Sequence, residues 1–252
     1  MEYTLARGHW DWRSSVPNKI DTMKNLIHSK NIHKSEVIGL ILGLLLLTAC
    51  GGSSKNKQMV GQSNGSGDLS KLLFSDDFSN TSSGWDRIST KDGMTNYVDG
   101  QYHIQINRTD YDVFANPYRS FNDVRVEVEA TDVGGVADNN FGIICRCANK
   151  DDYYAGLVTS DGHYGIFKFK GGVSTLLGAE TMPTSPVILP AQEMNLIRLD
   201  CIGSILTLFV NGIQLDIRQD TDFTSGDVGL LAGSYKTPGV EIAFDNFMVY
   251  NP

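Results

Sequence analysis

Several features that particular protein classes require are missing from this sequence. Its longest apolar run, from Val37 to Leu47, holds eleven residues, which at about 1.5 Å per residue span about half of a ~30 Å hydrocarbon core. Residues 1–49 take 6 of the 21 Lys and Arg and 4 of the 29 Asp and Glu, which leaves residues 50–252 with a formal charge of −10 and no basic cluster. We therefore expect neither a stable transmembrane helix nor a nucleic-acid partner, since an acidic surface repels phosphate backbones.

Histidine is also scarce. Beyond residue 50 the chain has only His103 and His163. Neither lies in a zinc-binding His-Glu-x-x-His pattern or beside a serine nucleophile motif. The sequence thus gives no support to a zinc-dependent or serine-dependent mechanism.

The apolar run lies where a secretory signal peptide has its hydrophobic region. Lys24, Lys30 and Lys34 precede it and Leu47-Thr48-Ala49-Cys50 follows it, so basic, apolar and small-residue segments occur in signal-peptide order. Leu-Thr-Ala-Cys resembles the lipobox of bacterial lipoproteins, which implies cleavage before Cys50 and a diacylglycerol on its thiol. Two or three acyl chains hold a protein durably, so the resemblance implies a lipid anchor at the extracytoplasmic face of the cell membrane. A buried cysteine at the end of an apolar core helix is the alternative.

The remainder divides into a linker and one domain. Residues 51–68 hold five Gly and four Ser, the composition of a flexible coil. We expect an N-terminal extension and signal peptide over residues 1–49, the lipidated cysteine and linker over 50–70, and a single domain over 71–252. Met23-Lys24-Asn25 would make an ordinary signal-peptide start, so Met23 is the expected initiator, and a long basic region that begins at Met1 is the alternative.

From Leu72 onward, apolar and polar residues alternate between Gly, Asn and Asp positions. Residues 102–106 and 124–128 both show the period of two residues that half-buried strands have. Asp161-Gly162 and Asn211-Gly212 are dipeptides typical of tight hairpins. About a dozen such strands predict an all-β fold of two packed antiparallel sheets, because one open sheet of that size would curl or split.

Seven segments between residues 73 and 250 share a family pattern. They are Phe78-Ser79 to Gly84-Trp85, Gly142 to Arg146, Tyr153-Tyr154, Asp161-Gly162 to Lys168, Asn211-Gly212, Ser225 to Leu230 and Phe244-Asp245-Asn246-Phe247. Together they resemble the concanavalin A-like jelly-roll superfamily, and within it the laminin-G-like domain of 3-keto-disaccharide hydrolases. The resemblance implies a two-sheet jelly-roll sandwich. It carries over no catalytic residue, because one fold hosts binding modules, hydrolases and other lipoproteins.

Glycoside hydrolysis needs two carboxyl groups across a cleft, and Glu127, Glu129 and Asp132 come nearest to such a set. Their order, Glu-x-Glu-x-x-Asp, imperfectly resembles the Glu-x-Asp-x-x-Glu strand of laminarinase-type jelly rolls. The simpler interpretation is that Glu127 and Glu129 form the polar face of a half-buried strand. We therefore expect binding rather than catalysis, with these three acids as the catalytic candidates.

Carboxylate oxygens for a structural calcium ion are available from Asp76, Asp77 and Asp245. In the jelly rolls that this chain resembles, the first and last strands lie together and an ion often joins them, which makes Asp77 and Asp245 the metal candidates. The alternative is that both carboxylates accept hydrogen bonds in turns. No other cofactor is expected.

Aromatic side chains on an exposed sheet face would stack on sugar rings. The candidates are Tyr111, Tyr118, Tyr153, Tyr154, Tyr164 and Tyr235. Tyr154 and Tyr164, from two strands of a predicted hairpin, are the first choice for ligand binding. Packing in the core is the alternative for each of them.

Three cysteines remain after Cys50. In an oxidising envelope we expect one disulfide and one free thiol. Domains that this one resembles place the strands of Cys145 and Cys201 near each other, which favours that pair, with Cys147 as the alternative partner. All three could also be small buried residues.

The sequence thus predicts a membrane-tethered lipoprotein whose jelly-roll domain binds carbohydrate. A glycoside hydrolase that acts on modified disaccharides is the second hypothesis, which follows from the family resemblance. A structural or adhesion protein is the third, and a large apolar surface patch would favour it.

Overall fold

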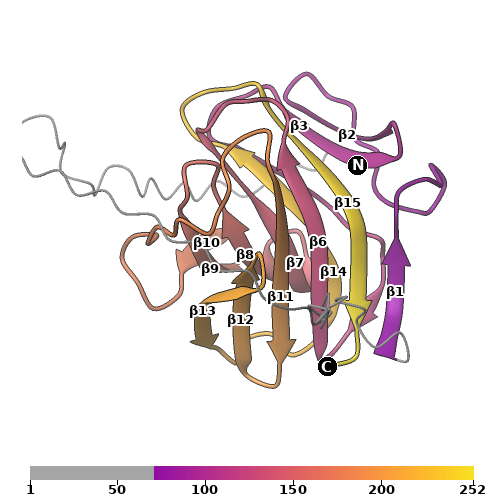
Figure 1. Cartoon of the computed structure of the whole chain (residues 1–252). Coiled ribbons are helices and arrows are strands. Elements are labelled where there is room, and N and C mark those ends of the chain that lie inside the picture. Colours follow the sequence, from indigo (N-terminus) through magenta and orange to yellow (C-terminus); the bar gives the residue numbers. More distant parts are fainter. Residues whose placement is uncertain (1–70) are drawn as a thin grey trace, which may run out of the picture. The chain divides into compact units, whose positions relative to one another are not determined.

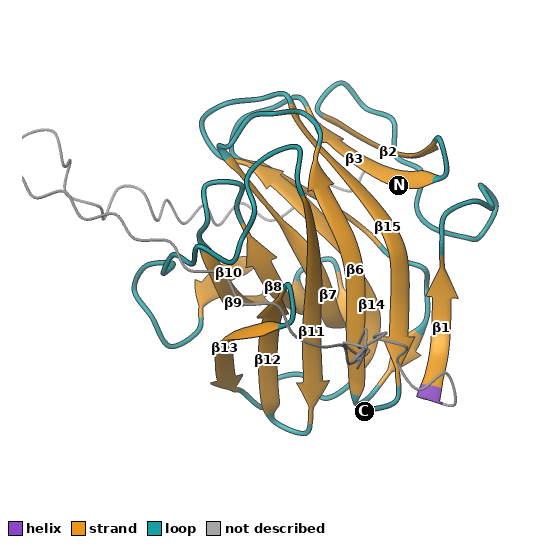
Figure 2. Ribbon diagram, in the orientation of Figure 1, coloured by secondary structure: helices purple, strands orange, loops and turns teal. Residues whose placement is uncertain are grey.

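The computed structural model describes residues 71–252, and the predicted signal peptide, Cys50 and the linker lie outside the described residues. This part of the chain forms fifteen strands in two antiparallel sheets (Figures 1 and 2). Within residues 71–252, no helix has the length and apolar character to span a membrane. The predicted all-β fold is confirmed.

We call the eight-stranded sheet sheet A. Its strand order is β13-β12-β11-β6-β15-β3-β2, and β1 pairs with β15, so the first and last strands lie side by side (Figure 1). Its strands are β1 (Leu72–Asp76), β2 (Gly93–Val98), β3 (Gln101–Ile106), β6 (Val124–Asp132), β11 (Met194–Ile202), β12 (Ile205–Val210), β13 (Ile213–Gln219) and β15 (Val240–Tyr250).

We call the seven-stranded sheet sheet B. Its strand order is β10-β9-β8-β7-β14-β4, and β5 pairs with β14. Its strands are β4 (Tyr111–Ala115), β5 (Ser120–Phe121), β7 (Asn139–Asn149), β8 (Asp152–Val158), β9 (Tyr164–Lys170), β10 (Val173–Leu176) and β14 (Gly226–Ser234).

The alternation read from the sequence sets the inner and outer faces of sheet A. In β6 every second residue from Val124 is buried, while Arg125, Glu127 and Glu129 between them are partly exposed. The hairpin between β12 and β13 turns at Asn211 and Gly212, whose φ angles of 51° and 81° are the two positive values that a type I′ turn needs. Local sequence therefore fixes both register and turn here.

The core lies between the two sheets. Val126, Leu199, Leu230 and Phe244 have no exposed surface, and burying each such side chain contributes about 1.5–3 kcal/mol. A disulfide between Cys145 of β7 and Cys201 of β11 crosses this core and joins the sheets, while Cys147 is a free thiol. This is the pairing that the family resemblance implied.

An aromatic cluster fills the core near β1. Trp85 contacts Phe78 with a ring separation of 5.3 Å and Phe247 with one of 4.9 Å. Asp76 accepts hydrogen bonds from the Trp85 indole N–H at 2.9 Å and from the Phe78 backbone N–H at 2.8 Å. Several positions of the family pattern, Phe78, Trp85 and Phe247 among them, are therefore packing residues.

Candidate functional site

The outer face of sheet A carries pairs of charged side chains, next to exposed apolar side chains such as Leu196, Ile205 and Ile217. Arg125 and Asp200 lie 3.2 Å apart, and Arg198 and Asp200 lie 2.5 Å apart. His103 and Glu241 form a further pair at 2.8 Å. A sheet face that turns to solvent is expected to be polar in this way.

The outer face of sheet B is apolar instead. In β9, Ile166 packs into the core between the sheets, whereas Phe167 and Phe169 belong to a second apolar cluster on the opposite side of the strand. That cluster, which we call the apolar face, consists of Phe114, Ile144, Tyr153, Ala155, Leu157, Phe167, Phe169, Leu176, Met182, Leu231 and Tyr235, each with little exposed surface. Because each of these side chains is at most 9% exposed, the face has little surface open to solvent in the structure.

Aromatic rings lie next to one another along this face. Tyr153 and Phe169 are register partners on β8 and β9, and their rings stack 4.4 Å apart at 14°. The Phe114 ring lies 5.8 Å from that of Tyr153. Burial raises the pKa of the Tyr153 phenol well above its usual value, and the negative charge of Asp112 adds to the effect. Tyr153 therefore stays neutral.

Polar side chains border one end of the apolar face at Gly233. Asp112 and Asn140 are its register partners on the two neighbouring strands, and a Cβ at Gly233 would lie 1.8 Å from Asp112 Oδ1. Asn140 Nδ2 donates to Asp112 Oδ1 at 3.4 Å, while Asn140 Oδ1 is buried and accepts no hydrogen bond. Leaving a buried acceptor unpaired costs about 1–3 kcal/mol, so a ligand hydroxyl or a water would stabilise this position.

A clamped loop borders the other end. Asp227 of β14 accepts the Arg119 backbone N–H at 2.7 Å, and Asp86 accepts the Asn116 backbone N–H at 3.0 Å and the Tyr118 hydroxyl. Burial raises the pKa of Asp227 to about 6, and the negative charge of Asp86 adds to this. The two carboxylates fix residues 116–119 and leave the Tyr118 ring 65% exposed.

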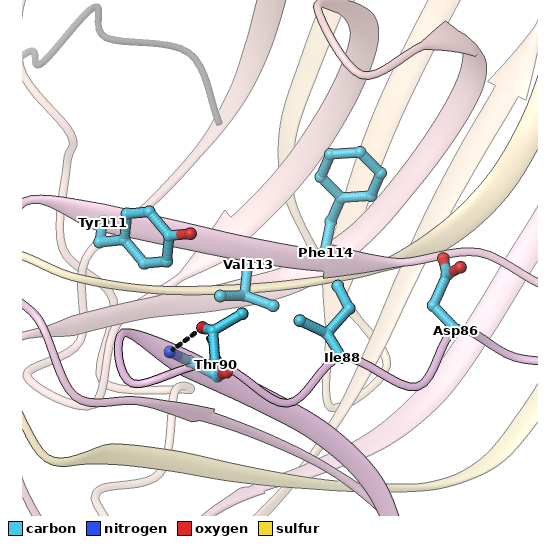
Figure 3. A pocket seen from close by; sticks show the side chains of 7 residues that line it. Asp86, Ile88, Thr90, Tyr111, Val113 and Phe114 are labelled. Atoms are coloured by element: carbon cyan, nitrogen blue, oxygen red, sulfur yellow. Dashed lines mark hydrogen bonds between the residues drawn. The ribbon is translucent and has the colours of Figure 1, made fainter. Parts of the chain in front are cut away.

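A small pocket opens beside this border, between the segment before β2 and strand β4 (Figure 3). Ile88 and Val113 line it together with Asp86 and Phe114, so it joins the clamped loop to the apolar face. Thr90 Oγ1 accepts the Gly93 backbone N–H at 3.0 Å and closes one wall (Figure 3). The pocket is mainly apolar and has one carboxylate at its rim.

Comparison with solved structures identifies the architecture, although no family model and no curated protein matches the chain. A carbohydrate-binding module, CBM66, from Bacillus subtilis aligns with a TM-score of 0.54 at 17% identity, over 67% of this chain and 96% of the module. A Bacillus subtilis protein of unknown function with a galectin-like fold aligns with a TM-score of 0.55 at 12% identity, over 71% and 96%. The chain has a galectin-like jelly-roll fold.

An enzyme has a similar jelly roll. The GlcNAcα1-4Gal-releasing endo-β-galactosidase from Clostridium perfringens aligns with a TM-score of 0.53 at 10% identity, over 72% of this chain and 63% of the enzyme. At such identities the similarity extends to the fold and not to individual residues. Function has to be argued from the site itself.

The structure corrects the choice of Tyr154. Its side chain has no exposed surface and packs between the two sheets, where its hydroxyl donates to Asp220 Oδ1 at 2.5 Å and accepts the Phe223 backbone N–H at 3.1 Å. Its neighbour Tyr153 points the other way and lies on the apolar face. Tyr164 is half-buried against the core. The hairpin pair therefore presents no exposed platform for sugar rings.

The three catalytic candidates do not share a face of the jelly roll. Glu127 lies 4.0 Å from Arg198, and Glu129 accepts Asn246 Nδ2–H at 3.0 Å, both on the outer side of β6. Asp132 is 1% exposed on the inner side, where it accepts Ser160 Oγ–H at 2.7 Å and Asn139 Nδ2–H at 2.8 Å. The expected carboxylate set is therefore not assembled.

Asp77 and Asp245, the calcium candidates, lie near each other. Burial raises the pKa of Asp245, and the charges of Glu129 and Asp77 contribute. Asp77 Oδ1 accepts hydrogen bonds from the Ser79 backbone and hydroxyl, and Asp76 is occupied by Trp85 and Phe78. In residues 71–252 no three His, Cys, Asp or Glu side chains gather as a metal site. These residues do not supply the six to eight oxygens that calcium takes, and calcium here remains a prediction from sequence.

Proposed function

We propose that the protein is a lipid-anchored extracytoplasmic lipoprotein whose jelly-roll domain binds carbohydrate on the apolar face of sheet B. The observation that carries this proposal is an aromatic outer sheet face with polar groups at both ends. Outer sheet faces that turn to solvent are ordinarily polar, and an apolar outer face is one that something covers. We infer that a ligand takes this place when the protein is bound.

The chemistry of the face suits a sugar chain. The C–H surfaces of sugar rings pack on aromatic rings, while hydroxyl groups pair with amides and carboxylates. Phe114, Tyr153 and Phe169 are 9%, 1% and 6% exposed, so a sugar chain reaches these rings only when the part of the chain that covers them moves aside. Asp227 and Gly233 are six residues apart on β14, which at about 3.3 Å per residue separates the two polar borders by about 20 Å. That length accommodates several linked sugar residues.

A hydrolase is the second candidate function. Asp227, with a pKa of about 6, is suited to general acid–base catalysis near neutral pH, and Asp86 supplies a neighbouring carboxylate. Loss of polysaccharide cleavage in Asp227→Asn, with binding retained, would support hydrolysis. An absence of cleavage by the wild-type protein would leave the binding role.

The binding proposal is tested by isothermal titration calorimetry of the purified protein with fructans, galactans, β-glucans and peptidoglycan fragments. We expect one class to bind and Tyr153→Ala and Asn140→Ala to weaken that binding at least tenfold. Arg125→Ala, on the outer face of sheet A, is the matched control and should bind normally. Failure of every glycan to bind, together with capture of a protein partner by the same face, would favour the adhesion hypothesis.

The lipid anchor is tested separately. Labelled palmitate should appear on the wild-type protein and not on a Cys50→Ser variant, which should leave the membrane fraction. A Cys50→Ser protein that remains membrane-bound and labelled would contradict the anchor. The carbohydrate proposal does not depend on this result.

A further inference from the structure

A second, open cleft lies at the edge of sheet A, outside the apolar face. Strands β1 and β15 and the loop at Arg119 line it, and its volume is about 510 Å³. Ligand pockets for small molecules typically measure 300–1,000 Å³. The cleft is therefore large enough for one or two sugar residues.

Some of the polar groups in the cleft are occupied within the fold. The Asp76 carboxylate accepts hydrogen bonds from the Trp85 indole N–H and the Phe78 backbone N–H. Ser83 Oγ and the Tyr97 hydroxyl form a hydrogen bond of 2.9 Å. These groups shape the wall. They are not available to a ligand without disturbing the aromatic cluster.

Arg119 is the cation of the cleft. Its guanidinium lies over the Phe74 ring, 4.5 Å from the ring centre, and its backbone N–H is held by Asp227. Among the described residues, the guanidinium forms no ion pair and donates no hydrogen bond. Since stacking and the clamped loop limit its movement, its donors are positioned in advance of any ligand.

Three further side chains provide donors and acceptors. Asn80 Oδ1 accepts the Ser82 backbone N–H at 3.0 Å, which leaves its amide N–H groups available. Asn246 donates through Nδ2 to Glu129, which leaves its Oδ1, and Asp77 uses Oδ1 for Ser79, which leaves its Oδ2. A mixture of donors and acceptors matches hydroxyl groups, which both donate and accept.

The charge around the cleft selects against acidic ligands. Two carboxylates, those of Asp76 and Asp77, line the cleft beside a single cation, Arg119. Arg119 is opposed by these carboxylates, so a carboxylated or phosphorylated sugar would meet net repulsion. A neutral sugar is not repelled by these carboxylates.

We propose that this cleft is a second carbohydrate-binding site, which takes a neutral sugar residue between Arg119, Asn80, Asp77 and Asn246. The inference rests on the proposed function in its ligand class but uses no residue of the apolar face. Two separate sites on one domain let a long glycan bind at both, which raises the overall affinity through effective concentration.

The test uses saturation-transfer NMR and titration with methyl β-glucoside, methyl β-galactoside, methyl β-fructoside and glucuronate. We expect at least one neutral glycoside to bind with a Kd of about 1 mM, a value ordinary for a single small ligand. Arg119→Met and Asn80→Ala should each weaken it about tenfold. Arg87→Met is the matched control, because Arg87 stacks on Tyr97 at 5.0 Å but does not line the cleft.

The outcomes separate the two sites. Monosaccharide binding that Tyr153→Ala leaves intact and Arg119→Met reduces supports the cleft. Equal binding by Arg119→Met and Arg87→Met, no binding of any neutral glycoside, or tighter binding of glucuronate would overturn the cleft site. Polysaccharide binding that depends on Tyr153 would in each of those cases still support the apolar face.

Discussion

The two sheets of the sandwich share one core but differ in the surfaces that they turn outward. Sheet A carries charged pairs such as Arg198 and Asp200, whereas sheet B carries stacked rings such as Tyr153 and Phe169. Both sheets need an apolar inner face to fold. Only the outer faces are free to differ, and this difference is the reason for proposing sheet B as the face that recognises a ligand.

The largest expected effect comes from removing an aromatic ring from each outer face. Tyr153→Ala should lower the free energy of unfolding by about 3 kcal/mol, as for other buried aromatic residues. Phe209→Ala, which removes the partly buried ring under Arg198 on sheet A, should cost about 1 kcal/mol. Urea denaturation of both variants measures this, and equal costs would mean that the two faces are energetically alike.

The next effect compares two adjacent asparagines on opposite sides of β7. Asn139→Leu should cost about 2–3 kcal/mol, because Asn139 Nδ2 donates to the buried Asp132 and Ser160 Oγ. Asn140→Leu should leave stability unchanged or raise it by about 1 kcal/mol, because its Oδ1 is already unpaired.

Glycan titration completes that comparison. Asn140→Leu should weaken polysaccharide binding about tenfold, whereas an Asn139→Leu protein that still folds should bind as tightly as wild type. If Asn140→Leu proved strongly destabilising, its Oδ1 would have a partner in solution that accounts for its position. Loss of stability would then replace ligand binding as the reason for the residue.

The alternation of apolar and polar residues decides for which strands the core-facing side could be predicted from the sequence. In β3 and β6 one parity is apolar and the other polar, so the inner face is evident from the residues alone. In β8 both parities are apolar, since Tyr153 and Tyr154 are each buried, so the pattern does not reveal which side faces the core. The error at Tyr154 has this cause.

The position of Asp132 could be predicted from the sequence, whereas the conformation of the loop at residues 116–119 could not. Asp132 differs in parity from Glu127 and Glu129, so its place on the opposite face was already implicit in the spacing. The hydrogen bonds that hold residues 116–119 could not be predicted from the sequence. Asp86 and Asp227 are 141 positions apart, and only the tertiary fold brings both to one loop. The signal that did exist for the disulfide was the family resemblance.

A smaller effect is expected from pH at the border of the apolar face. The pKa of Asp227 is about 6 in the folded protein and 3.8 as its ordinary value, so the folded state binds more protons between these values. The contribution of this residue to stability is therefore greatest below about pH 4 and is lost as the pH rises through 6. Partial exposure limits the change to about 1 kcal/mol.

Urea denaturation between pH 4 and 7 measures the contribution of Asp227. The wild-type protein should lose stability over this range relative to Asp227→Asn, whose side chain does not titrate. Parallel curves for the two proteins would show that Asp227 has an ordinary pKa. In that case the border carboxylate would be ionised at neutral pH and unsuited to act as a general acid.

The smallest effect is expected on the charged face. Glu127→Gln and Glu129→Gln together should change the free energy of unfolding by less than about 1 kcal/mol, because exposed ion pairs contribute little and salt screens them. Polysaccharide binding at the apolar face should be unchanged, since both carboxylates lie on the outer side of sheet A, whereas the cleft site can respond because Glu129 accepts a hydrogen bond from Asn246. A large loss of binding or of any polysaccharide cleavage in this double variant, with stability retained, would move the functional surface to sheet A and reverse the comparison.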